Sequence, residues 1–284
     1  MNHKERHLKP SSLKKLRQTI ARLVGFFGED RPLHTIRPEE VQNWFDEMCD
    51  QLSMASARTH AGNARSIFGT AIEWKFLQES PVPAGVKGGS TASQNDRYVS
   101  DQELEAIIEA CPNSQWRVLV GVAGYAGLRV PSESHGLCFA DIDWSRGRMR
   151  VRSPKTERFD GKEARFVPIH PALQPLLMEA FDRASEGQER VLTMNHGGQT
   201  NRAFRRILER AGLEPWRDAF QTLRRSREKT WCEQFPQYVV SQWIGHSITV
   251  SGKHYANHAL DHHFERAAGL GLEAAQKAAQ QDAV

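Results

Sequence analysis

The sequence has no long hydrophobic run. Nowhere in its 284 residues do about 18 or more apolar residues follow one another, which is the length that a membrane-spanning helix needs. The first residues, MNHKERHLKPSSLKK, are basic but lack the apolar core of a secretory signal peptide. We therefore expect a soluble, cytoplasmic protein that makes no contact with a membrane.

Cysteine is scarce, and its four copies are scattered. Cys49, Cys111, Cys138 and Cys232 form no CxxC pair, which argues against a disulfide framework and against a zinc-thiolate site. The sequence also lacks a GxxxxGK phosphate-binding loop. We expect no cofactor and no bound metal.

One group of histidines offers an alternative to that expectation. His254, His258 and His262 recur at every fourth residue, a spacing that can bind zinc if all three lie on one helix face. The competing interpretation is an ordinary polar helix surface, interrupted near Asp261, and it is the one that we adopt.

Basic residues exceed acidic residues only slightly. There are 38 Lys and Arg residues against 34 Asp and Glu residues, which gives a net charge of +4 and a pI of about 8.9. The distribution is more informative than the excess, because the arginines gather in clusters, as a phosphate-binding surface requires. Solvated helix faces would give the same pattern. The three stretches are Arg146 to Arg152, Arg202 to Arg210 and Arg224 to Lys229.

Residues 1–80 are expected to form a small helical domain. Apolar residues recur there at steps of three and four, which predicts helices with one buried face. Pro38 with Glu39 and Glu40 is typical of a helix start. A third helix is expected from about Ser53 to Phe76. The predicted core positions of the last two helices are Val41, Trp44, Phe45, Met48, Ile67, Phe68, Ala71, Ile72 and Phe76.

A stretch of proline, glycine and small polar residues predicts a linker at residues 81–97. The second domain, residues 98–270, begins with a capping box at Ser100 to Glu103. Alternating apolar and charged residues within 141–169 predict a β-hairpin or a small three-stranded sheet. Helices follow, and residues 271–284 form an alanine-rich tail. The fold class is mainly α with a small antiparallel β-sheet.

Several residues of the second domain are unremarkable when each is taken alone. An arginine at a helix end is usually a surface charge, a lysine in a turn is usually solvated, and a tyrosine in a helix is usually half-buried. Their order along the chain is what carries information. They are Arg129 in GLR with Glu133 after it, Lys155 in SPKT, Arg224 in QTLRR, His246 in IGHS and Tyr255 nine residues later in KHYANH.

This order and spacing closely resemble the tyrosine recombinase, or phage integrase, family. The GLRVPSE and IGHS…HY segments are the specific part of the resemblance. It implies that residues 98–270 are a catalytic domain and that residues 11–76 correspond to the helical, SAM-like core-binding domain of the family. The activity it implies is site-specific recombination, in which DNA is cleaved and rejoined through a 3′-phosphotyrosine intermediate.

The resemblance implies a role for each of these residues. Tyr255 is the nucleophile, and Arg129 and Arg224 hold the charged phosphate with their planar donor forks. Lys155 is the general acid for the leaving 5′-oxygen. His246 donates a hydrogen bond to the phosphate or orients the tyrosine, and Glu133 supports Arg129. Because a phosphotyrosine bond conserves the energy of the broken bond, rejoining needs no ATP.

One position departs from the family pattern. Gln221 stands three residues before Arg224, where the family usually has histidine. A glutamine can donate a hydrogen bond to a phosphate oxygen, but it cannot take up and release a proton at neutral pH. Either His246 takes over as base, or base assistance is minor.

The sequence is also compatible with two other functions. A recombinase-like accessory protein that binds DNA with weakened catalysis is favoured by Gln221 but has no need of Tyr255. A type IB topoisomerase-like enzyme would share the chemistry and relax DNA without a specific site.

The expected partner is double-stranded DNA, bound mainly through phosphate contacts that weaken with salt. The resemblance implies a homotetramer on paired DNA sites, and we expect that the free protein can be a monomer. The candidate DNA-contacting residues are Arg58, Arg65, Arg202, Arg205, Arg206 and Arg225.

Overall fold

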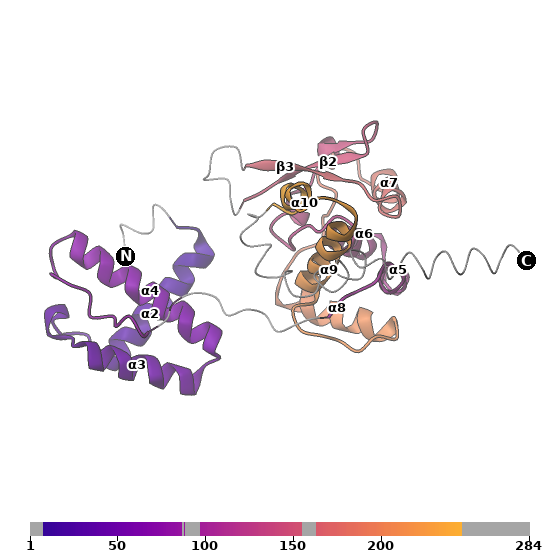
Figure 1. Cartoon of the computed structure of the whole chain (residues 1–284). Coiled ribbons are helices and arrows are strands. Elements are labelled where there is room, and N and C mark those ends of the chain that lie inside the picture. Colours follow the sequence, from indigo (N-terminus) through magenta and orange to yellow (C-terminus); the bar gives the residue numbers. More distant parts are fainter. Residues whose placement is uncertain (1–7, 87, 89–96, 155–162, 246–284) are drawn as a thin grey trace, which may run out of the picture. The chain divides into compact units, whose positions relative to one another are not determined.

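The computed structural model describes residues 8–86, 88, 97–154 and 163–245. The chain divides into two compact units, Met1–Ser93 and Gln94–Val284. The first unit is helical, and the second combines helices with a small sheet (Figure 1). The predicted fold class, mainly α with a small antiparallel sheet, is therefore confirmed for the described residues.

The described residues of the first unit form three α-helices: α2 (Pro10–Phe27), α3 (Pro38–Gln51) and α4 (Met54–Glu73). A short 3₁₀ helix, Leu33–Thr35, precedes α3. The start of α3 follows the predicted signal, because a proline opens it and a carboxylate of its first turn, from Glu40, accepts the backbone N–H of Arg37 at 2.9 Å.

The core of the first unit lies where α3 and α4 meet. The predicted stripe of α3, which is Val41, Trp44, Phe45 and Met48, is buried. It belongs to the same buried cluster as a row of small residues on α4, which are Ala57, Ala61 and Ala64.

A buried hydroxyl links α2 to α4. Thr19 Oγ1 accepts a hydrogen bond from Asn63 Nδ2 at 2.9 Å and lies 2.8 Å from Nδ1 of His60. The same hydroxyl donates to the carbonyl oxygen of Lys15 at 3.0 Å. A satisfied polar group of this kind fixes how the two helices face each other.

The end of α4 differs from the prediction. Phe76 was expected in the core, but its side chain is 65% exposed. The helix ends at Glu73, and Lys75 adopts a left-handed conformation with φ of 63°. The chain therefore turns away from the helix before Phe76, which then packs edge-on against Trp74 instead of the core.

The segment after α4 packs on the first unit as far as Val86. Val82 and Val86 are buried in the core of α3 and α4. Arg65 of α4 donates hydrogen bonds to the carbonyl oxygens of Pro83, at 3.2 Å, and Val86, at 2.8 Å. The first residues of the stretch 81–97 are thus held in place by an arginine of the preceding helix.

The second unit contains six helices and three strands among its described residues. No described helix is both long and apolar enough to cross a membrane. Two 3₁₀ helices, Ser134–Gly136 and Phe139–Asp141, precede the sheet. The main elements are α5 (Asp101–Glu109), α6 (Ser114–Gly124), β1 (Ile142–Asp143), β2 (Arg148–Arg152), β3 (Ala164–Pro168), α7 (Gln174–Asp182), α8 (Gly198–Arg210), α9 (Ala219–Gln234) and α10 (Gln237–Ile244).

The sheet has the order β1–β2–β3 with antiparallel neighbours. On β2, Met149 and Val151 are buried while Arg150 and Arg152 are exposed, which is the predicted alternation. The longest pairing joins β2 to β3, with Met149 opposite Val167. Residues 155–162, which follow β2 and precede β3 in the chain, lie outside the described residues.

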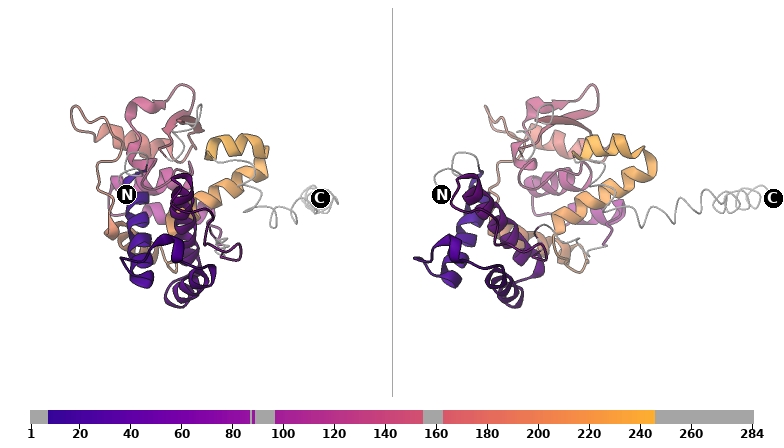
Figure 2. Two further views of the ribbon diagram at one scale, coloured as in Figure 1. Left: turned by 90° about the vertical axis from the view of Figure 1, so that its left-hand side faces the viewer. Right: turned by 60° about the vertical axis from the view of Figure 1, so that its left-hand side comes forward.

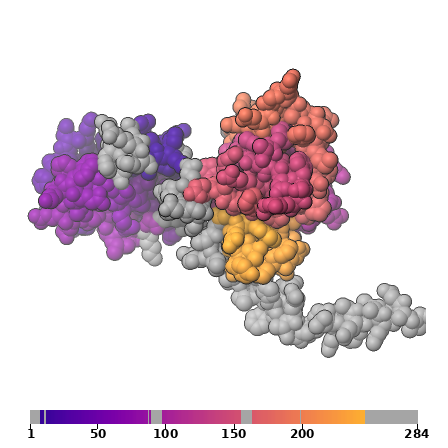
Figure 3. Space-filling model, turned by 90° about the horizontal axis from the view of Figure 1, so that it is seen from above, coloured from indigo at the N-terminus to yellow at the C-terminus, as the bar shows by residue number. Residues whose placement is uncertain are grey.

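Helix α6 is the centre of the second unit. All of its residues from Val118 to Gly124 are buried, and it packs against α5, α7 and α9. Figures 1 and 2 place the sheet at one end of this unit and α8 at the other, with α6 and α9 between them. Helix α10 lies against β3 at the sheet end, where Figure 3 shows the two segments as neighbours.

Candidate functional site

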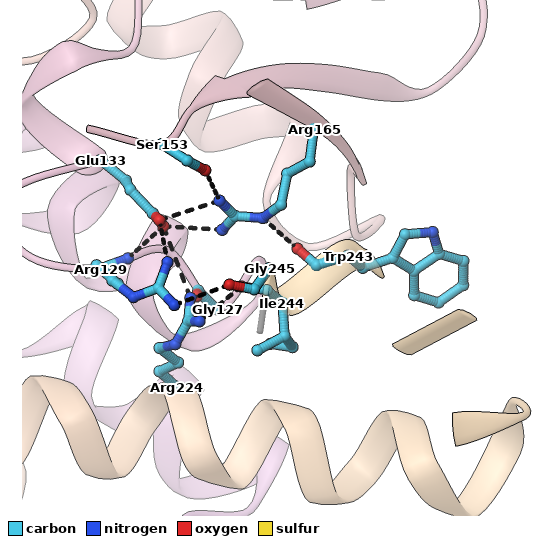
Figure 4. A network of polar contacts seen from close by, with 9 residues as sticks. All are labelled: Gly127, Arg129, Glu133, Ser153, Arg165, Arg224, Trp243, Ile244 and Gly245. Carbon is cyan, nitrogen blue, oxygen red and sulfur yellow. Dashed lines mark hydrogen bonds and ion pairs between the residues drawn. The ribbon is translucent and has the colours of Figure 1, made fainter. Parts of the chain in front are cut away.

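A buried carboxylate organises the region where α6, β3, α9 and α10 meet. Glu133 is only 2% exposed, and the guanidinium groups of Arg129, Arg165 and Arg224 surround it. We call these four residues the Glu133 cluster (Figure 4). Because a buried charge is costly unless it is paired, the three arginines explain how this carboxylate can be buried.

Arg129 follows the turn at the end of α6. Its backbone N–H donates to Oε2 of Glu133 at 2.9 Å, and its Nη1 is hydrogen-bonded to Oε1 of the same carboxylate. Its Nη2 donates to the carbonyl oxygen of Gly245 at 3.0 Å. The side chain of Arg129 is 19% exposed, so it is the most accessible arginine of the cluster.

Arg165 reaches the cluster from β3. It grips both carboxylate oxygens of Glu133, with Nη1 to Oε1 at 3.0 Å and Nη2 to Oε2 at 2.8 Å. Its Nη1 also donates to the hydroxyl of Ser153 at 2.8 Å, and its Nε donates to the carbonyl oxygen of Trp243 at 2.6 Å. One guanidinium therefore joins the hairpin, the carboxylate and α10.

Arg224 points inward from α9 and is almost fully buried. Its Nη1 donates to the carbonyl oxygen of Gly127, and its Nη2 donates to that of Ile244 at 2.6 Å. It lies 3.6 Å from Oε2 of Glu133. These two hydrogen bonds use two of its five N–H donors.

The three arginines share one further target, which is the C-terminal end of α10. Three consecutive carbonyl oxygens, those of Trp243, Ile244 and Gly245, each accept a hydrogen bond from a different arginine of the cluster (Figure 4). The last carbonyls of a helix have no partner within the helix and carry a partial negative charge, so cations are favoured there. The arginines thus fix the position at which α10 ends.

Gly245 allows this arrangement. Its φ of +75° is left-handed, as is common where a helix ends. A Cβ at this position would lie 2.9 Å from Cδ of Arg165, so a side chain would also push that arginine away. Both the conformation and the space require glycine here.

The electrostatics of the cluster favour a charged Glu133. Burial alone would raise the pKa of this carboxyl, but the hydrogen bonds and charge of Arg165, with the charges of Arg129 and Arg224, outweigh burial and lower the pKa to about 2. Burial and the neighbouring charge of Arg129 lower the pKa of Arg224, although a guanidinium stays protonated in proteins. Three cations and one carboxylate leave a net charge of +2, which suits an anionic ligand.

Gln221 lies one turn before Arg224 and is exposed. It lines a pocket of about 580 Å³ together with Arg205 of α8 and His196. The structure therefore places the residue that departs from the family pattern on an accessible surface, beside one of the arginines that the sequence assigned to DNA.

Three of the predicted site residues, Lys155, His246 and Tyr255, lie outside the described residues. Lys155 and His246 each directly follow a described residue in the chain. Ser153, which Arg165 contacts, stands two residues before Lys155, and Gly245 directly precedes His246. The histidines considered for zinc, His254, His258 and His262, also lie outside the described part. Among the residues described, no group of three His, Cys, Asp or Glu side chains could hold a metal ion.

The charge pattern from Arg224 to Lys229 suggested one phosphate-binding surface. The basic side chains of this stretch do not form one. Arg227 is buried, donates to the carbonyl oxygen of Gly124 at 2.9 Å and pairs with Asp101. It therefore ties α9 to the end of α6 and the start of α5. Arg225 is half-buried and donates to Thr222 at 3.2 Å.

The remaining candidates for DNA contact differ in exposure. Arg202, Arg205 and Arg206 are all exposed on α8, while the other face of that helix, with Phe204 and Leu208, is buried. On α4, Arg58 is half-buried, and its Nε has no hydrogen-bond partner. Arg65 is exposed but holds the two carbonyl oxygens of the following segment.

Arg165 was not among the site residues predicted from the sequence. A signal for it exists, because Arg165 and Val167 are two residues apart on β3 and so point to the same face of the sheet. Val167 is buried. An arginine on the core-facing side of a strand needs a buried partner, but the sequence does not say that the partner is Glu133.

Comparisons with solved structures show which proteins share this fold. The Tn1549 transposon integrase in complex with transposon right end DNA is 15% identical, with a TM-score of 0.72, covering 92% of this chain and 95% of that chain. A lambda integrase dimer bound to a COC′ core site is 19% identical, with a TM-score of 0.67, covering 86% and 90%. The XerA recombinase is 17% identical, with a TM-score of 0.51, covering 93% and 94%.

A comparison with curated protein sequences found no match. The phage integrase family model, in contrast, matches residues 97–262, which is more than half of the chain. The matched span contains Arg129, Glu133 and Arg224 as well as the predicted Lys155, His246 and Tyr255. The chain therefore belongs to the phage integrase family, and it is a site-specific tyrosine recombinase.

Proposed function

We propose that this recombinase cleaves one DNA strand by attack of Tyr255 and that the Glu133 cluster supplies the positive charge that holds the target phosphate. The observation that carries the proposal is the convergence of Arg129 and Arg224 at the end of α10. Both donate to its last carbonyl oxygens, directly before His246 in the chain. Arg129 and Arg224 are thus linked through one helix end, and in the sequence His246 follows that end directly, with Tyr255 nine residues further on.

The proposed reaction is an exchange of one phosphodiester for another. The phenolic oxygen of Tyr255 gives up its proton to His246 or to water and forms a bond to phosphorus, while the bond from phosphorus to the 5′-oxygen breaks. Lys155 donates a proton to that leaving oxygen. In rejoining, a 5′-hydroxyl attacks the 3′-phosphotyrosine and the tyrosine leaves, so the number of phosphodiester bonds is unchanged and no ATP is consumed.

The arginines act on the charge that develops in the transition state. Its non-bridging oxygens carry more negative charge than those of the ground state, and preorganised donors in a site of low polarity stabilise that charge strongly. Arg129 and Arg224 are preorganised, because Glu133 and the carbonyl oxygens of α10 fix both side chains. Arg129 is the more exposed of the two and would meet the phosphate first.

The partner that we propose is double-stranded DNA, with phosphate contacts from the exposed arginines of α8. Arg205 supports this, because it shares a pocket with Gln221, close in sequence to Arg224. We assign the first unit to core-site DNA binding, with Arg58 as its candidate contact. The proposed active assembly is a tetramer on two DNA sites; of the proteins compared above, the lambda integrase is described as a dimer on its core site.

Covalent trapping tests the proposal. The full chain is incubated with a library of nicked suicide DNA substrates, from which a cleaved strand end is lost, and protein–DNA adducts are separated under denaturing conditions. Without added ATP, we expect an adduct with the wild-type chain and with Tyr238→Phe. We expect no adduct with Tyr255→Phe. Tyr238 is the matched control, because it is an exposed tyrosine of α10.

Two results would overturn the proposal. An adduct that persists in Tyr255→Phe would assign the nucleophile elsewhere. Sequence-selective DNA binding without any adduct across the library would favour a binding protein with weakened catalysis.

A further inference from the structure

We propose that Arg165 is a positioning residue of strand transfer: it neutralises Glu133, so that the positive charge of Arg129 and Arg224 is available to the DNA phosphate, and it ties the hairpin to the end of α10. This inference rests on the proposed function of the Glu133 cluster. Arg165 does not itself need to touch DNA, because its side chain is only 9% exposed.

The hydrogen bonds of Arg165 support neutralisation. It is the arginine that contacts both oxygens of Glu133 with its side chain, at 3.0 Å and 2.8 Å. A bidentate pair of this kind is stronger and more directional than a single contact. Arg224, in contrast, lies 3.6 Å from the carboxylate and directs its hydrogen bonds to backbone carbonyl oxygens.

The charges lead to the same conclusion. Glu133 with Arg129 and Arg224 alone would have a net charge of +1, and both arginines would be drawn toward the carboxylate. Arg165 raises the net charge to +2 and occupies both carboxylate oxygens. The two arginines that face the proposed phosphate are then free to place their remaining N–H donors on it.

The same side chain connects the two segments that lead to predicted catalytic residues. Its Nη1 holds the hydroxyl of Ser153, two residues before Lys155, and its Nε holds the carbonyl oxygen of Trp243, three residues before His246. Ser153 is itself buried, so the contact is shielded from water. A shift of Arg165 would therefore displace the start of both segments.

The test compares Arg165→Met, Glu133→Gln and the double variant in the full chain. Methionine keeps the length and apolar stem but removes the charge. At saturating DNA we expect the rate of adduct formation in Arg165→Met to fall by ~10²-fold or more, the scale for loss of transition-state charge stabilisation. We expect the Kd for DNA to change by less than ~3-fold, because Arg165 is buried.

The double variant separates neutralisation from simple loss of packing. In Arg165→Met the negative charge of Glu133 stays buried with one positive charge fewer beside it. Glu133→Gln removes that negative charge. We therefore expect Glu133→Gln to raise the adduct rate of Arg165→Met by about 10-fold, although it lowers the rate of the wild-type chain. If Arg165 acted only by tying the hairpin to α10, Glu133→Gln would not raise the adduct rate of Arg165→Met.

Controls keep the outcomes distinct. Arg183→Met removes an exposed, ion-paired arginine of the same unit and should leave the rate unchanged. If Arg165→Met fails to fold, Arg165→Lys replaces it; we expect this variant to bind DNA normally and to react about 10-fold more slowly, because one ammonium cannot match a bidentate fork.

An adduct rate within ~3-fold of wild type in a folded Arg165 variant, or additive losses in the double variant, would overturn the role of Arg165. Absence of an adduct in the wild-type chain would instead refute the proposed function.

Discussion

Arg224 on α9 donates a hydrogen bond of 2.6 Å to the carbonyl oxygen of Ile244, the last residue of α10. The same guanidinium holds the carbonyl oxygen of Gly127, in the turn that follows α6. Its fork thus connects the end of α10 to a turn that is far away in the sequence, and a residue proposed to bind phosphate is at the same time a structural connection.

Arg224→Lys should therefore damage both stability and catalysis. A single ammonium cannot serve both carbonyl oxygens, and a buried acceptor without a donor costs about 1–3 kcal/mol. We expect a lower midpoint of thermal unfolding and an adduct rate reduced by ~10²-fold or more. Calorimetry and single-turnover trapping measure the two effects, with the exposed Arg183→Lys as the control. A variant as active as wild type would contradict the role of Arg224.

Glu133→Gln should remove a pH-dependent contribution to stability. The pKa of Glu133 is lowered from an ordinary 4.5 to about 2 in the folded chain, so the charged form stabilises the fold above the unfolded pKa. At neutral pH the contribution is about 3 kcal/mol. It is lost as the pH falls from about 4.5 toward the folded pKa, because the carboxyl then takes up a proton.

Urea unfolding of wild type and Glu133→Gln measures this difference. The gap in unfolding free energy should be widest near neutral pH and should shrink below about pH 4. Glu179→Gln is the matched control, since Glu179 belongs to partly exposed ion pairs, and such pairs contribute at most about 1 kcal/mol. A gap that does not change with pH would show that Glu133 acts through packing alone.

Gln221→His should accelerate cleavage and make it depend on pH. Gln221 is exposed, so an imidazole fits without displacing the core. A base at this position would take the proton of the attacking tyrosine, and we expect about a 10-fold faster adduct rate, at the low end of general base catalysis. The gain should rise with pH through about 6.5, because only neutral imidazole accepts a proton. Gln221→Asn, which cannot titrate, should show no such rise, and equal pH profiles for the two variants would sink the idea.

Arg65→Met should lower the stability of the first unit and have a smaller effect on the preference for particular DNA sequences. The variant loses two hydrogen bonds to the segment after α4, at 3.2 Å and 2.8 Å. We expect the free energy of unfolding of this unit to fall by about 1–2 kcal/mol and the segment around Val86 to become more sensitive to protease. Arg58→Met should instead lower DNA affinity. Loss of discrimination between DNA sites, with unchanged stability, would instead show that Arg65 contacts DNA, as the sequence suggested.

Much of the fold follows from local signals. The start of α3 at Pro38, the capping box at Ser100 and the alternation through β2 each depend on neighbours in the sequence, and all three are present in the structure. Phe76 was misplaced because the periodic pattern continues past the residue where the helix ends. Lys75 ends that pattern by adopting a left-handed conformation, which its sequence does not signal.

Only those site residues that belong to the family motif were predicted from the sequence. Arg129, Glu133 and Arg224 are indeed together. Arg165 and Arg227 were not distinguished from surface arginines, because their burial depends on partners that are distant in the chain. Arg165 meets Glu133, and Arg227 meets Gly124 and Asp101. Charge patterns alone cannot separate an arginine that faces DNA from one that closes a helix end.

The carbonyl oxygens at the end of α10 have a consequence for the order in which the protein is made. Trp243, Ile244 and Gly245 come after all three cluster arginines in the chain. While the ribosome is still synthesising the preceding residues, these acceptors do not yet exist, and the arginines can contact only Glu133 and the carbonyl oxygen of Gly127. A nascent chain therefore cannot complete the hydrogen bonds of the cluster until the end of α10, the last part of the described fold, has been translated.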